Sequence, residues 1–341
     1  MTTNEKKFLI ISLALAPVFL FNSCQKDPLP DIQSIVDTDA DDAMAIMYLL
    51  QHQEISVDAI TICGTGMSYP IPATKNALGL IELAGKPNIP VACGDTIAMY
   101  SNNTQFRPVA WISEANNMMG IELPVNPNPA VDLGAVDFMI GFLNYAEKPV
   151  RIVEFGPMTN LGCVLMQSPG LASKIESVYI MGGAVNVPGN LQDGGITNNP
   201  YAEWNIFLDP LAADIVFKSG VNITLVPLDA TNKAPVTTTF LNRFSKDHNT
   251  TEADFVFAVI SKLKDELSSD LDFWDPLAAA ISSDQSIATT HTLPISIITE
   301  EGNENGRTKI DSLSENMITV CYDTDLNSFE NLFLDVLNGR K

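Results

Sequence analysis

The chain has 341 residues, of which 46% are hydrophobic and 18% are charged, a balance typical of folded globular proteins and not of disordered or collagen-like chains. Its 41 acidic and 19 basic residues give a formal net charge of −22, which would repel a phosphate backbone, so nucleic-acid binding is not expected. The five cysteines show no CxxC spacing, which argues against a zinc site or a disulfide framework.

The first 23 residues have the pattern of a secretory signal. Lys6 and Lys7 precede an almost uninterrupted apolar stretch, residues 8–21, which is shorter than the ~20 residues that a membrane-spanning helix needs. Ser23 before Cys24 resembles the processing site of bacterial lipoproteins and predicts lipidation of Cys24; ordinary signal cleavage nearby is the alternative. Residues 24–30 then form a short tether, so we expect an exported lipoprotein, periplasmic or anchored to the outer membrane.

From residue 31 onward, short β-branched runs alternate with helical patterns. This alternation predicts an α/β fold with an open, mostly parallel central sheet and helices on both faces, of Rossmann type. No linker divides residues 31–341, so we expect one catalytic domain with long loops near 95–130 and 183–205. In chain order, the expected strands are 32–36, 57–62, 90–93, 150–155, 178–181 and 223–228, and the expected helices are 42–51, 72–84, 160–167, 210–219 and 252–267.

Polar turns follow the expected strands. Open α/β sheets bind their ligands at the carboxyl ends of the strands, so these turns should meet at one edge. They comprise residues 37–42, 64–66, 94–95, 156–157, 182–183 and 229–231.

The first of these turns holds four carboxylates, those of Asp37, Asp39, Asp41 and Asp42, before an apolar helix. Helix capping explains one or two of them. Keeping the others ionised in one concave site requires a cation, or else one carboxyl takes up a proton. Oxygen ligands without His or Cys favour a hard ion, Ca²⁺ before Mg²⁺. A solvated acidic turn without a metal is the alternative.

Residues 36–45, Val-Asp-Thr-Asp-Ala-Asp-Asp-Ala-Met-Ala, resemble the DxDxxxDDA signature of the inosine-uridine preferring nucleoside hydrolase family. The resemblance covers most of residues 31–285 and implies the fold of that family and its activity, hydrolysis of the N-glycosidic bond of ribonucleosides. Further segments match in the order of the family: 76–91, 156–161 (Gly-Pro-Met-Thr-Asn-Leu), 181–190, 202–210 and 274–278.

The resemblance also implies a Ca²⁺ site. Its ligands would be Asp39, Asp42, the backbone carbonyl of Phe155, and Asp275. Asp39 would in addition be the general base that takes a proton from the attacking water. The chemistry suits such an arrangement, because a metal lowers the pKa of water and acids stabilise the positive charge of a ribosyl cation.

The sugar contacts of the family fall on five residues. Asp41 would bind the 2′-hydroxyl, Asn205 and Asp275 the 3′-hydroxyl, and Asn190 with Glu203 the 5′-hydroxyl. A firm grip on the sugar aligns the attack of water. Polar capping of a turn is the alternative for Asn205 and Glu203, and a helix start before Pro276 is the alternative for Asp275.

The sequence departs from the family pattern at three places. The signature is two residues short between Asp39 and Asp41, so Asp37 is an alternative ligand or base. Thr65 stands where many members have Asn. Trp274 stands where uridine-cleaving members carry a His that protonates the leaving base, whereas purine-preferring members stack the base on Trp, so a purine nucleoside is expected. A place for Trp274 in the core is the alternative.

These observations predict a Ca²⁺-dependent purine nucleoside N-ribohydrolase, assembled as a dimer or tetramer like family members. One rival is a lipoprotein that binds a nucleoside or ribose with Ca²⁺ but does not cleave it. A second is a Mg²⁺-dependent phosphohydrolase of the haloacid dehalogenase type, suggested by residues 37–39 after a strand. That type has Thr or Val four positions after its first Asp, where this chain has Asp41.

Overall fold

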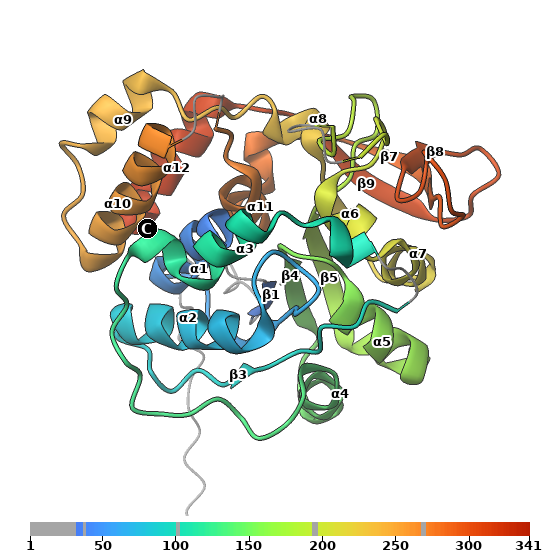
Figure 1. Cartoon of the computed structure of the whole chain (residues 1–341), viewed down its shortest axis with the longest axis horizontal. Coiled ribbons are helices and arrows are strands. Elements are labelled where there is room, and N and C mark those ends of the chain that lie inside the picture. Colours follow the sequence, from blue (N-terminus) through green and yellow to red (C-terminus); the bar gives the residue numbers. More distant parts are fainter. Residues whose placement is uncertain (1–31, 37–38, 100–102, 193–196, 267–270) are drawn as a thin grey trace, which may run out of the picture.

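The structure is a computed structural model that describes residues 32–36, 39–99, 103–192, 197–266 and 271–341 (Figure 1). The predicted signal segment, the tether, Cys24 and Asp37 lie outside the described residues. Within the described part of the chain, no helix has both the length and the apolar character needed to cross a membrane.

A nine-stranded sheet forms the centre of the molecule, in the order β3-β2-β1-β4-β5-β6-β9-β7-β8. Its first six strands pair in parallel, which confirms the predicted fold class. The ends of each strand differ by three residues or fewer from the predicted ends. They are β1 (Ile32–Val36), β2 (Val57–Ile62), β3 (Val91–Ala92), β4 (Val150–Glu154), β5 (Ile175–Met181) and β6 (Ile223–Val226).

The C-terminal part of the chain completes the sheet with strands that the sequence analysis did not assign. β9 (Met317–Thr324) pairs in parallel with β6, and β7 (Ala288–Ile297) lies antiparallel between β9 and β8 (Thr308–Ile310). The last helix, α12 (Leu326–Leu337), then returns to pack near α1 and α11.

The five predicted helices form, with ends that differ by two residues or fewer from the prediction. They are α1 (Ala40–Gln51), α2 (Pro70–Leu83), α5 (Thr159–Gln167), α7 (Pro210–Lys218) and α10 (Thr251–Glu266). The predicted loop near 95–130 contains a helix, α3 (Val109–Asn116). The remaining helices of the described residues are α4 (Ala135–Tyr145), α6 (Trp204–Leu208), α8 (Leu228–Thr231), α9 (Thr238–Phe244) and α11 (Trp274–Ser283).

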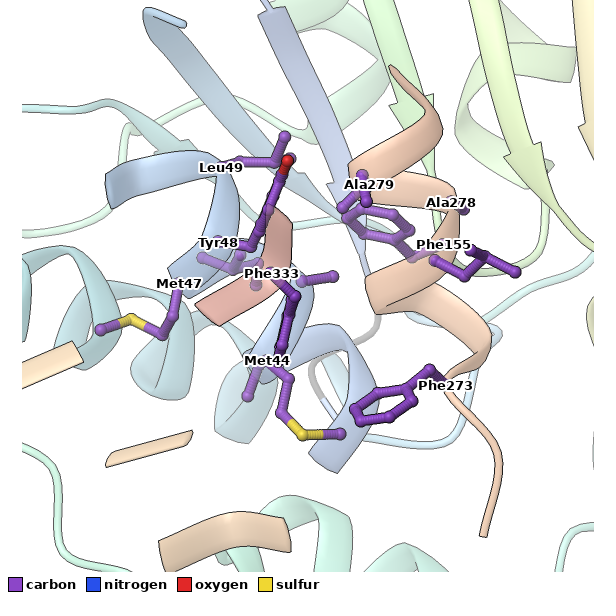
Figure 2. Packing of buried hydrophobic residues seen from close by; sticks show 14 of the residues in the cluster. Met44, Met47, Tyr48, Leu49, Phe155, Phe273, Ala278, Ala279 and Phe333 are labelled. Carbon is purple, nitrogen blue, oxygen red and sulfur yellow. The ribbon is translucent and has the colours of Figure 1, made fainter. Parts of the chain in front are cut away.

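Two apolar cores cover the two faces of the sheet. Neighbouring residues of one strand belong to different cores, as Ile35 and Val36 do, because successive side chains of a strand point to opposite faces. Helix α1 is buried from Asp42 to Leu50 and packs against α11 and α12 (Figure 2). The Tyr48 ring stacks on Phe333 with 5.8 Å between centroids. This packing fixes the start of α1 beside the start of α11.

Candidate active site

The predicted acidic turn lies where β1 ends and α1 begins. Asp39 is the N-cap of α1, and its Oδ1 accepts a hydrogen bond from the backbone N–H of Asp41 at 3.2 Å. Asp42 completes a capping box, since its Oδ2 accepts the backbone N–H of Asp39 at 3.3 Å. Capping therefore orients both carboxylates at the start of the helix.

Asp275 joins this turn from the far end of the sequence. It is the second residue of α11, buried like Asp42, and α11 packs against α1. Carboxylate oxygens of Asp39, Asp41, Asp42 and Asp275 all lie within 4.8 Å of one another. Four anionic groups this close, two of them out of solvent, repel one another unless a cation or a proton compensates them. The donor set, made only of oxygens, fits a hard divalent ion.

The backbone carbonyl of Phe155 belongs to the same edge of the sheet. Phe155 directly follows β4, and its N–H donates to the carbonyl of Ile35 at 3.0 Å, next to the end of β1. Its carbonyl oxygen accepts from Nδ2 of Asn205 at 2.7 Å. A carbonyl oxygen has two lone pairs, so one remains for a cation.

Glu203 and Asn205 lie at the start of α6, and both bond to the segments that follow β4 and β5. Glu203 is the N-cap, and its carboxylate accepts backbone N–H groups of Asn205, Ile206 and Gly183 at 3.0, 3.2 and 2.9 Å. Burial raises the pKa of the Glu203 carboxyl, and these N–H groups oppose the rise. Glu203 thus does cap the helix, as the alternative had it, and the same bonds hold its carboxylate in a fixed orientation.

Asn205 is fixed by its amide. Its Nδ2 donates to the carbonyls of Phe155 at 2.7 Å and Met181 at 3.2 Å. The amide nitrogen must face these two acceptors, so the side chain presents its oxygen to a ligand. Asn190 presents an oxygen as well, because its Oδ1 is buried and has no hydrogen-bond partner among the described residues.

The profile of the family described as inosine-uridine preferring nucleoside hydrolase matches residues 34–331. The chain belongs to this family. The pyrimidine-specific ribonucleoside hydrolase RihA of Escherichia coli O127:H6 is 32% identical over 313 residues, 88% of this chain and 96% of that protein. RihA of Shewanella sp. (strain MR-7) is 37% identical over 207 residues, 59% of this chain, which spans 60% of that relative.

A solved structure of the family agrees in fold. The purine-preferring ribonucleoside hydrolase from Gardnerella vaginalis superposes with a TM-score of 0.74 at 28% identity, covering 91% of this chain and 98% of its own. The chain is therefore a ribonucleoside N-ribohydrolase. Its relatives differ in the nucleosides that their names give: RihA is pyrimidine-specific, and the Gardnerella vaginalis enzyme is purine-preferring.

Trp274 and Thr65, two of the departures from the family pattern, have clear places in this nucleoside hydrolase. Trp274 is the first residue of α11, directly before Asp275, and its half-buried ring packs against the core around α1. Thr65 is fully buried. Its hydroxyl forms hydrogen bonds with the Thr159 hydroxyl at 2.8 Å and with the Cys63 Sγ at 3.1 Å. Thr65 thus belongs to a buried network beneath the site.

Two buried aspartates near the site were not among the predicted site residues. Asp209 caps α7 through the Ala212 N–H, accepts the Thr159 hydroxyl at 2.8 Å, and holds the backbone N–H of Met99 at 2.8 Å. Burial raises its pKa. Asp229 holds the loop after β5. The sequence gives only weak signals for them: an Asp before Pro210, and an Asp in a turn after a strand.

Proposed function

We propose that this nucleoside hydrolase is Ca²⁺-dependent and prefers purine nucleosides, from which it releases base and ribose by direct attack of water. One observation carries the proposal: seven of the predicted site residues each bring at least one acceptor oxygen, and four of these residues are carboxylates whose oxygens lie within 4.8 Å of one another. A ligand for such a site must bring its own donors or positive charge, as a sugar polyol, a metal ion and a ribosyl cation do. These acceptors belong to Asp39, Asp41, Asp42, Asn190, Glu203, Asn205 and Asp275.

Asp39, Asp42, Asp275 and the Phe155 carbonyl would hold the ion. The donors are all hard oxygens, and they come from α1, α11 and the β4 end, a loose arrangement that suits the flexible, high coordination number of Ca²⁺ better than the strict octahedron of Mg²⁺. When bound, the ion would lower the pKa of a water molecule and orient it.

Asp39 is placed to accept a proton. It is half-buried at the rim of the cluster, and one of its oxygens already accepts the Asp41 N–H. That bond orients the carboxylate, which would take the proton of the attacking water. Asp41, also half-buried, would hold the 2′-hydroxyl, while the remaining acids would stabilise the positive charge that develops on the ribose.

Trp274 supports the purine preference. Its ring precedes the buried Asp275 and is only partly covered by the core, so part of it is open to a ligand. An indole N–H has no pKa suited to acid catalysis, so the ring would bind the leaving base by stacking, and a purine offers the larger surface. The name of the Gardnerella vaginalis relative agrees with a purine preference, whereas the RihA names do not.

We also propose an exported lipoprotein, attached through a lipid on Cys24 and assembled as a dimer or tetramer. The basic and apolar N-terminal segment and the Ser23-Cys24 pair support the anchor. The oligomer follows from the family resemblance alone.

A panel of nucleosides tests the activity. Release of reducing sugar from inosine, adenosine, uridine and cytidine is measured with Ca²⁺ and with EGTA. We expect inosine or adenosine to turn over fastest, and EGTA to abolish all release. Faster release from uridine would refute the purine preference, and full activity in EGTA would refute the metal. Nucleoside binding without any release would favour the binding lipoprotein instead.

A further inference from the structure

The loop that follows β5 is held to the protein at both of its ends. The backbone N–H of Gly183 donates to Glu203 Oε2 at 2.9 Å, and that of Gly189 donates to the carbonyl of Pro200 at 2.9 Å. Gly189 lies so close to residue 202 that an added Cβ would stand 2.0 Å from the Ala202 carbonyl oxygen. Asn190 follows directly, so its backbone position depends on this loop.

Asp229 holds the middle of the same loop. Its Oδ2 accepts the N–H of Val185 at 2.8 Å, and its Oδ1 accepts the N–H of Asn186 at 2.9 Å and the Asn186 side-chain amide at 3.0 Å. Asp229 is buried in the first turn of α8, directly after β6. Hydrogen bonds to an ionised carboxylate are about twice as strong as neutral ones, and three of them converge here on one loop.

A further backbone bond joins the same two segments. The N–H of Leu228 donates to the carbonyl of Gly183 at 2.9 Å. The loop is therefore clamped to the end of β6 over residues 183–186, and to residues 200–202 at Gly189. Between the two clamps the backbone has only residues 187 and 188 without such a bond to the neighbouring segments. The acceptor of Asn190 is thus set in place before a ligand arrives.

We propose that Asp229 is a positioning residue: it fixes the loop of residues 183–190 so that the buried, unpartnered Oδ1 of Asn190 accepts the 5′-hydroxyl of the nucleoside. This proposal rests on the proposed function. Asp229 does not act on the reacting bond. Its contribution is a rigid sugar grip, since a contact held rigidly in place loses less entropy on binding.

Substrates with and without the 5′-hydroxyl isolate this contribution. We expect Asp229→Ala to lower kcat/KM for inosine roughly tenfold, the scale of one well-placed hydrogen bond, and for 5′-deoxyinosine less than twofold. Asn190→Ala should give the same pattern. Since both changes remove one contact, the double variant should lose no more than either single variant.

Asp325→Ala is a matched control. Asp325 is also a carboxylate at a helix start, and it accepts the N–H and the hydroxyl of Ser328 at 3.2 and 2.8 Å, at the start of α12. Its loss should change the two substrates alike. If Asp229→Ala does not fold, Asp229→Asn replaces it, because the amide keeps the shape but sets an N–H₂ donor against the N–H groups of the loop.

Binding gives a second measurement that does not need turnover. In the Asp39→Asn background, at a Ca²⁺ concentration high enough to saturate this variant, calorimetry should show that Asp229→Ala weakens the binding of inosine but not of 5′-deoxyinosine. Equal losses for both ligands, or no loss for either, would overturn the positioning role. An unaltered enzyme that binds nucleosides but releases no sugar would instead refute the proposed hydrolysis, and the affinity ratio would still decide the role of Asp229.

Discussion

Replacing Asp42 by Asn should make the metal-free protein more stable than the unaltered protein, and calcium should then cancel most or all of that advantage. In the metal-free protein, Asp42 repels three other carboxylates whose oxygens lie within 4.8 Å. At that distance a pair of unit charges costs about 0.9 kcal/mol in bulk water and about 3.5 kcal/mol at an effective dielectric constant of about 20. Asn removes this repulsion and keeps an oxygen to accept the Asp39 N–H.

The expected free energies follow from these numbers. Partial protonation and solvent reduce the repulsion, so we expect Asp42→Asn to be more stable than the unaltered protein by about 1 to 3 kcal/mol in EGTA. Calcium at about 100 times its Kd should then stabilise the unaltered protein by about 2.7 kcal/mol, and the variant by much less. In a chain of this size, the calcium-induced rise in Tm is on the order of 5 °C.

Thermal unfolding of both proteins in EGTA and in excess CaCl₂ measures both effects. Asp137→Asn is the control, because Asp137 lies in the first turn of α4, is exposed, and does not belong to the cluster. It should leave the calcium response unchanged. The reasoning is refuted if calcium stabilises Asp42→Asn as much as the unaltered protein, or if the variant is the less stable protein in EGTA.

Three further predictions concern single residues. Asp39→Asn should keep its fold by circular dichroism but lose kcat by a factor of about 10² to 10⁴; an active Asp39→Asn beside an inactive Asp37→Asn would move the base to Asp37. Trp274→Ala should cost roughly 1 to 3 kcal/mol of transition-state stabilisation for inosine and less for p-nitrophenyl riboside, whose leaving group needs no activation; equal losses would assign Trp274 to the core. Burial raises the pKa of Asp209 in the folded state, so its contribution to stability is largest at low pH and is lost as the pH rises through that pKa. Urea unfolding should therefore show the advantage of the unaltered protein over Asp209→Asn falling as the pH rises above about 4, the ordinary pKa of an aspartate, and a rising advantage would contradict this.

The parallel half of the sheet could be predicted because its strands and helices differ in hydrophobic period. Strands β1 to β6 are short apolar runs followed by helical patterns, and both faces of the sheet are buried. Strand β7 gave no such signal. Its residues 289–292 are exposed, and Pro294 within it argues against a strand by local rules. Its pairing with β9 depends on tertiary structure.

Some residues of the candidate site could likewise be predicted from the local sequence, and others depend on tertiary packing. Asp39, Asp41 and Asp42 are neighbours in the sequence, so their cluster could be predicted from local spacing. Asp275 reaches them only because α11 packs on α1, and only the family resemblance indicated it. Asp229 was missed as a site residue because two of its three bonds to the loop come from backbone N–H groups, which every residue type except proline carries and which therefore leave no mark in a sequence.

The two halves of the site depend on different kinds of bond. Glu203, Asn205 and Asp229 are held mainly by backbone amides and carbonyls, and none of the bonds described for them involves the acid quartet of Asp39, Asp41, Asp42 and Asp275. The grip on the 5′ end of the sugar is thus independent of the quartet, whereas Asp41 and Asp275 of the quartet would hold the 2′- and 3′-hydroxyls. A lineage that lost only Asp39, the proposed base, would lose hydrolysis and keep every sugar contact proposed above. The step from enzyme to receptor is therefore short on this scaffold, and an engineered nucleoside sensor could begin from a single substitution.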